Sequence, residues 1–299
     1  MPMTEKHGAT SIAGSGVRLP EQIDVKNILY VTDFSRGAER AAPLVRRLAK
    51  TYEAHVTLLH VWSKTAAAVA QAGYMGNFAD DLESASRREL EACARSHFPE
   101  IESEFHTAGG EPCNCVRSAI QHKNIDLVVI GAERQSGVTR TLFGCTVEEM
   151  LHRIQVPVVT IGPKARKTGA SRAAKLLVPV TDWAADQVPQ VARKMSREFG
   201  TSMTLLRIGQ GSSLVRMRVP TSEEAAERLA VDASLVDFIS DEREECKAIV
   251  EAAEARDVDM IAMCVAAPHG LLKHLRSSLP YRVIMAAHCP VLTTASAKK

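Results

Sequence analysis

Few residues of this 299-residue chain combine the type and spacing that catalysis requires. The ten histidines are scattered, and the sequence contains no nucleophile elbow, Walker loop or zinc-binding histidine pair. His269 and His274 could respond to pH, or they could be ordinary surface residues. Asp33 follows an apolar run of strand length and could at most orient a water molecule or a magnesium ion. We therefore expect no catalytic residue and no resident metal site.

The seven cysteines do not form a disulfide framework, because their number is odd and the chain is large. Cys113 and Cys115, the one close pair, have poor spacing for a metal or redox site, and we expect small buried side chains there. Cys145 falls at the start of a predicted helix, where the helix dipole stabilises a thiolate. It is either a reactive sensor thiol or a small residue in a packed turn.

A long internal repeat indicates which elements position these residues. Residues 124–160 align with residues 257–293 without a gap: Asp126 matches Asp259 and Pro157 matches Pro290, an offset of 133 positions in both cases. Repetition at this length predicts one fold present twice. We expect a disordered N-terminal segment over 1–24, a first domain over 25–162, a linker over 163–173 and a more compact second domain over 174–295.

Strand and helix patterns alternate in both halves of the chain. Aliphatic runs such as Asn27–Val31 are separated by helical patterns, which predicts an α/β fold: a doubly wound parallel sheet with helices on both faces. Ser35 can cap the first helix, and Pro43 inside that helix should kink it or face solvent. The other strands are predicted at His55–Val61, Ile101–His106, Asp126–Ile130, Pro157–Ile161, Leu176–Val180, Ser202–Ile208, Leu235–Ile239, Asp259–Cys264 and Val291–Thr294. The other helices are predicted at Asp81–Ser96, Cys113–His122, Leu142–Ile154, Ala184–Phe199, Ser222–Val231, Asp241–Arg256 and Leu272–Ala287.

The composition excludes several classes of partner. A net charge of +2 gives no electrostatic footprint for nucleic acid or an anionic membrane, and 4% aromatic residues argue against stacking on single strands. The apolar runs are shorter than the ~20 residues that span a bilayer, and the first residues lack the apolar stretch of a secretory signal. We expect a cytoplasmic protein with no nucleic-acid or membrane partner.

Four short motifs in order carry a family resemblance. The order of these motifs resembles that of the universal stress protein domain: Thr32-Asp33-Phe34-Ser35 after a strand, a strand ending in Leu58-Leu59-His60-Val61, the run Asp126–Gly131 and the closing Pro157–Ile161. A weaker copy of the same order covers about 174–294. The resemblance implies an open five-stranded parallel sheet with strand order 3-2-1-4-5 in each domain. It also implies that the two domains associate through their last strands, and that homodimers could form.

The ATP-binding branch of that family implies a ligand site. Its loop after the fourth strand reads Gly-x-x-Gly, nine residues, then Gly-Ser/Thr, and the strand order places the ligand between strands one and four. By this resemblance ATP, with Mg²⁺ accompanying it, would bind in the first domain, with its adenosine end at Asp33 and its adenine against Val61. The residues implied to bind it are Thr32, Asp33, Val61, Gly131, Arg134, Gly137, Gly144, Cys145 and Thr146.

Both copies depart from this pattern. In the first, Arg134 replaces the second glycine and Cys145 the closing serine; Arg134 and Arg140 either supply charge to a bound anion or are solvated at a decayed site. The second copy keeps Asp182 and Gly270, but Ala184 replaces the capping serine. Its loop carries Cys264, Ala267, Ser277 and Ser278 at the pattern positions, and the two serines could hold a small anion.

Two functions of different class remain. The first is a stress-response protein that binds ATP or another adenine nucleotide as a conformational signal, with at most slow ATPase activity. The second is an interaction or scaffold module in which both sites have decayed. An adenylating enzyme of related fold lacks a supporting motif.

Overall fold

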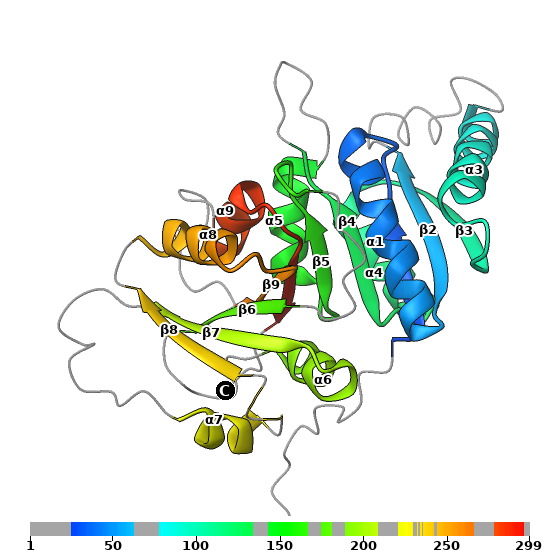
Figure 1. Ribbon diagram of the computed structural model, residues 1–299. Helices are drawn as coiled ribbons and strands as arrows, with labels where there is room; N and C mark the ends of the chain where they lie inside the picture. The colour runs from blue at the N-terminus through cyan, green and yellow to red at the C-terminus, as the bar shows by residue number, and fades with distance from the viewer. Residues whose placement is uncertain are drawn as a thin grey trace, which may run out of the picture.

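The computed structural model shows two α/β halves joined side by side (Figure 1). The predicted disordered segment 1–24 lies outside the part of the chain that the structure describes. The described residues are 25–62, 78–133, 143–166, 175–180, 189–208, 221–229, 232, 234, 236–241, 244–265 and 278–295.

One ten-stranded sheet runs through both halves, with strand order β3-β2-β1-β4-β5-β10-β9-β6-β7-β8. The first half therefore has the predicted order 3-2-1-4-5, and the second half repeats it in reverse. The strands within each half are parallel. Their bounds are β1 (Asn27–Val31), β2 (His55–Trp62), β3 (Ser103–Gly109), β4 (Leu127–Gly131), β5 (Val158–Ile161), β6 (Lys175–Val180), β7 (Ser202–Ile208), β8 (Val236–Asp241), β9 (Met260–Val265) and β10 (Val291–Ala295).

The two halves meet where β5 pairs with β10, the one antiparallel pair of the sheet. The predicted association through the last strands is confirmed. In this pair Val159 lies opposite Leu292, and the 133-residue offset of the repeat makes these two residues equivalent. Equivalent residues face one another only when a twofold axis passes between them, so the halves are related by a local pseudo-twofold axis through this point.

Helices cover both faces of the sheet and create two hydrophobic cores. Alternate residues of β1 enter different cores: Ile28 and Tyr30 belong to one, Leu29 and Val31 to the other. Each core extends through both halves, so the two halves share their interiors. The first core is covered by α1 (Arg36–Tyr52), α3 (Phe78–His97), α6 (Gln190–Phe199) and α7 (Ser222–Leu229), and the second by α4 (Pro112–His122), α5 (Phe143–Arg153), α8 (Glu245–Ala255) and α9 (Leu279–Ala286).

Helix α1 shows why the predicted elements form. The Ser35 hydroxyl accepts the Ala38 N–H at 3.3 Å, which caps the first turn as predicted. The helix ends at Tyr52, and Glu53, directly after it, adopts a left-handed conformation with φ of 51°. Pro43 lies inside the helix and is exposed, the second of its two predicted placements.

Some element bounds differ from the predicted ones because neighbouring strands extend or stop pairing. Strand β3 was predicted over Ile101–His106, but it continues to Gly109 because Gly109 pairs with Trp62 of β2. Asp241 was predicted to begin a helix, but it is the last residue of β8 and pairs with Ile208. Helix α8 begins later because Glu244 caps it by accepting the Lys247 N–H.

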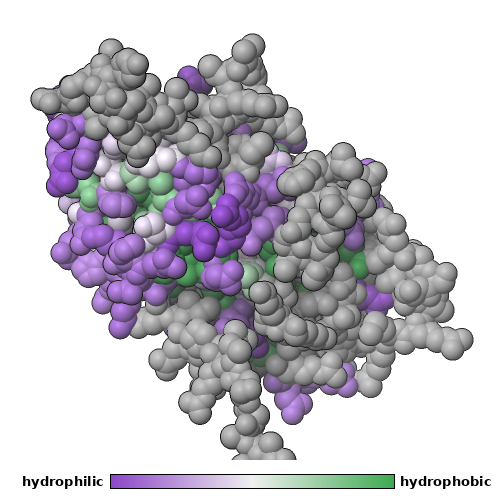
Figure 2. Space-filling view, turned by 180° about the vertical axis from the view of Figure 1, so that it is seen from behind, coloured by the Kyte–Doolittle hydropathy of each residue, from purple (hydrophilic) through white to green (hydrophobic). Residues whose placement is uncertain are grey.

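No helix among the described residues is long and apolar enough to cross a bilayer. From behind, the described surface is mainly hydrophilic, with hydrophobic side chains visible only in small patches (Figure 2).

The join between the halves is tightly packed beside the strand pair. A β-carbon at Gly162, directly after β5, would lie 1.9 Å from the carbonyl oxygen of Ile284 in α9. Nearby, the Thr293 hydroxyl donates to the Val158 carbonyl at 3.2 Å, and the Arg166 N–H donates to the His288 carbonyl at 2.8 Å. Backbone contact this close requires the absence of a side chain at Gly162.

We predict that Gly162→Ala lowers the free energy of unfolding by about 2–3 kcal/mol, because α9 must move away from β5. Urea unfolding followed by circular dichroism measures this change. Gly200→Ala is the matched control: its β-carbon would meet nothing within 4 Å, and its φ of 62° makes the expected loss only about 1 kcal/mol. Equal losses for both variants would contradict the close contact.

Candidate functional site

A compact turn follows β1 at the carboxyl edge of the sheet. Thr32 is buried, and its hydroxyl accepts the Phe34 N–H at 3.0 Å. The Asp33 carboxylate accepts the Ser35 N–H at 3.0 Å through Oδ1, an Asx turn that leads into α1. The turn therefore fixes the Asp33 side chain beside the first turn of a helix, where negative charge is favoured.

An aromatic pair, not expected from the sequence, closes this turn against β2. The ring of Phe34 stacks on the ring of His60, with 4.6 Å between centroids and 29° between planes. Nδ1 of His60 lies 2.9 Å from the Thr32 carbonyl oxygen; since a carbonyl can only accept, Nδ1 carries the proton. Phe34 reaches this position with φ of 60°, in the left-handed region that bulky side chains rarely adopt.

The end of β4 lies beside the start of α1. Arg40 of α1 donates to the Ala132 carbonyl at 3.3 Å, and its guanidinium lies 3.8 Å from the Glu133 carboxylate. A β-carbon at Gly131 would lie 2.0 Å from the Gly37 carbonyl oxygen. Gly131 is thus required for helix–strand packing, a reason independent of any ligand.

The structure brings four of the predicted site residues together. Thr32 and Asp33 follow β1, Val61 lies buried near the end of β2, and Gly131 is the last residue of β4. Because β1 pairs with both β2 and β4, these residues lie at the same edge of the sheet. Arg134 and Gly137 lie outside the described residues. Gly144, Cys145 and Thr146 lie in the first turn of α5; the structure describes their backbone but not their side chains.

The corresponding edge of the second half carries different side chains. Cys264, the counterpart of Gly131, places its sulfur 3.7 Å from the Thr294 hydroxyl, so a side chain fills a position where the pattern has glycine. Arg207 of β7 is buried. Ser278 precedes α9, and Pro280 lies in the first turn of that helix, as predicted. Asp182, Ala267, Gly270 and Ser277 lie outside the described residues.

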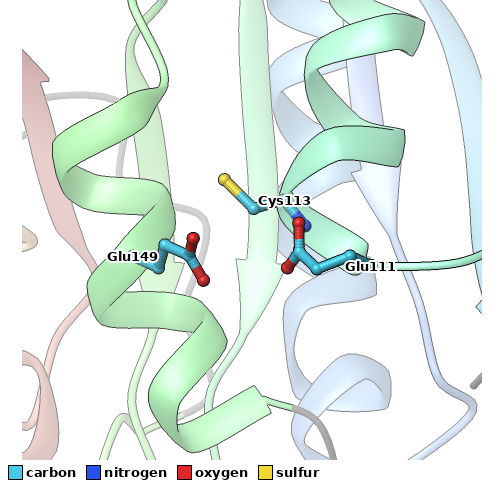
Figure 3. A group of neighbouring side chains, drawn as sticks. All are labelled: Glu111, Cys113 and Glu149. Atoms are coloured by element: carbon cyan, nitrogen blue, oxygen red, sulfur yellow. The ribbon is translucent and has the colours of Figure 1, made fainter. Parts of the chain in front are cut away.

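A second cluster of polar side chains lies between α4 and α5, where Glu111, Cys113 and Glu149 converge within 4.8 Å (Figure 3). Both carboxylates have protein partners. Glu111 caps α4 by accepting the N–H groups of Cys113 and Asn114 at 3.0 and 2.9 Å, and Glu149 forms an ion pair with Arg153. Burial raises the pKa of the Cys113 thiol to about 11. The cluster is therefore explained by helix capping and ion pairing around a protonated thiol.

Comparison with known proteins gives a family for the first half of the chain. Residues 24–162 match the model of the universal stress protein family, so this part of the chain belongs to that family. No curated protein matches the sequence.

Solved structures extend the likeness to the whole chain. A universal stress protein from Archaeoglobus fulgidus is 18% identical, with a TM-score of 0.72 over 93% of this chain and 99% of that one. A protein of unknown function from Pseudomonas aeruginosa is 14% identical, with a TM-score of 0.54 over 92% of this chain and 94% of that one. The two-domain fold of this chain is therefore shared, over nearly its whole length, with these two solved structures.

Burial and electrostatics predict unequal thiol reactivity. We expect Cys113 to react far more slowly than Cys264 with a thiol reagent at pH 8, because Cys113 is fully buried and its pKa is about 11, whereas Cys264 is partly exposed. Cys289, buried with its pKa raised to about 12, should be equally slow. Timed alkylation followed by peptide mass spectrometry ranks the sites. Labelling of Cys113 at the rate of Cys264 would contradict this placement.

Proposed function

We propose that this chain is a stress-response protein whose first domain binds ATP or another adenine nucleotide at the carboxyl edge of β1, β2 and β4. Nucleotide occupancy would act as a conformational signal, with at most slow hydrolysis. The match of residues 24–162 to the universal stress protein family supports this function, and the geometry of Asp33 is the observation that carries it. A cytoplasmic location accords with the same family.

The described residues suit the nucleoside end of such a ligand. Oδ1 of Asp33 is committed to the turn, whereas Oδ2 accepts no hydrogen bond from the described part of the chain and remains able to accept from sugar hydroxyls. Val61 supplies an apolar surface one strand away. The phosphates, with Mg²⁺, would then be bound by the loop that contains Arg134, Gly137 and Arg140 and by the start of α5.

A second function follows from the departures in that loop. Gly131 is explained by its contact with Gly37, so its presence does not argue for a phosphate. Arg134 occupies a position where the pattern needs glycine. Both features favour an interaction module without nucleotide, which works through protein contacts.

Nucleotide binding to Asp33 variants separates the two functions. We expect saturable binding of labelled ATP to the purified protein, weakened at least about tenfold by Asp33→Ala, because that change removes the acceptor for the sugar. Asp33→Asn keeps the acceptor of the Asx turn but not the charge, and should bind with intermediate affinity. Gly144→Val, which adds bulk at the start of α5, should abolish binding.

Asp232→Ala is the matched control. Asp232 accepts the Ser234 N–H at 2.9 Å in the same kind of turn, but away from the proposed site, so its loss should leave ATP affinity unchanged. Absence of saturable binding to the unaltered protein would reject the nucleotide function and leave the interaction module.

A further inference from the structure

A carboxylate of the first half caps a helix of the second. Oε1 of Glu148, on α5, accepts the backbone N–H of Ser278 at 2.5 Å, and Ser278 is the residue that precedes α9. The two residues are 130 positions apart and belong to opposite sides of the β5–β10 pair. Helices α5 and α9 lie next to one another at the centre of the molecule (Figure 1).

The start of α9 has the properties of an anion site. The positive end of the helix dipole lies there, together with the backbone N–H groups of the first turn, which Pro280 lacks, and both attract negative charge. The buried Oγ of Ser278 has no hydrogen-bond partner within the described ranges, and so adds an unused polar atom beside the same N–H. A negatively charged group is bound there in the structure, and that group is Glu148.

Among the residues with described positions, no charged side chain pairs with Glu148, whereas the charged side chains near it pair with one another or with other residues. Glu149, the next residue of α5, pairs with Arg153. Arg282, in the first turns of α9, pairs with Glu244 at 2.6 Å and not with Glu148. The helix end therefore provides the compensating positive potential for this carboxylate.

The contact has no carboxylate counterpart across the pseudo-twofold axis, because the sequences of the two halves differ at these positions. The offset of 133 positions matches Ser278 with Cys145 at the start of α5, and matches Glu148 with Tyr281 on α9. Tyrosine is uncharged at neutral pH. Tyr281 is therefore the residue that would cap the start of α5 in the same way, and it has no carboxylate.

We propose that the N-terminus of α9 is an anion site that the chain fills with its own Glu148 carboxylate. Glu148 takes the place of an external phosphate, keeps such ligands out of the second half and ties α5 to α9. Where the proposed nucleotide function holds, this leaves one nucleotide per chain, in the first half. The site itself involves no residue beside Asp33, so it can be tested with inorganic phosphate alone.

Thermal unfolding in phosphate, at constant ionic strength, tests this site in the full-length protein. Glu148→Ala should gain a phosphate-dependent rise in Tm beyond that of the unaltered protein, by about 3 °C at a phosphate concentration ten times Kd. Glu148→Gln keeps the packing and a neutral acceptor, and should gain a smaller rise. Glu149→Ala, which removes the adjacent carboxylate, should respond like the unaltered protein.

Ser278→Pro added to Glu148→Ala should cancel the gain, because it removes the N–H while the φ of Ser278, −61°, already suits proline. Phosphate responses of Glu148→Ala and Glu148→Gln equal to that of the unaltered protein would overturn the proposal. If Glu148→Ala does not unfold cooperatively, the response of Glu148→Gln decides. Neither result affects the nucleotide function, which the Asp33 variants test.

Discussion

The antiparallel pairing of β5 with β10 is the constraint on which the rest of the structure depends. Because equivalent residues, Val159 and Leu292, face one another, the pairing fixes a local twofold relation between the halves. It merges two five-stranded sheets into one and lets both cores continue across the join. It also brings α5 of the first half against α9 of the second, which makes the contacts of Gly162 and Glu148 with α9 possible.

The symmetric scaffold carries unequal sites. The first half presents Asp33 in a turn held by Thr32 and Phe34, at the edge where doubly wound sheets bind ligands. At the matching edge of the second half, the Cys264 side chain contacts Thr294, and the helix end beyond it is capped from the other half. A duplicated fold of this kind can keep one half for a ligand and use the other as a partner that completes the sheet.

The sequence predicts the fold well because the repeat and the aliphatic runs depend on local spacing alone. It predicts the site less completely. Nothing in the pattern indicates that Phe34 adopts a left-handed conformation and stacks on His60, since this depends on how β1 and β2 align. The resemblance implies that Gly131 binds the nucleotide, but its contact with Gly37 gives the same residue a packing role. Glu148 looks like one more solvated helix residue until the join between the halves is known.

The central claim is that one sheet carries one open ligand site and one site filled by the chain itself. Crystals grown with a non-hydrolysable ATP analogue test this claim most directly. The account predicts one nucleotide per chain beside Asp33, with Glu148 still bound to the Ser278 N–H. A nucleotide at the edge of β6 and β9, or Glu148 displaced from α9 by its phosphates, would contradict it.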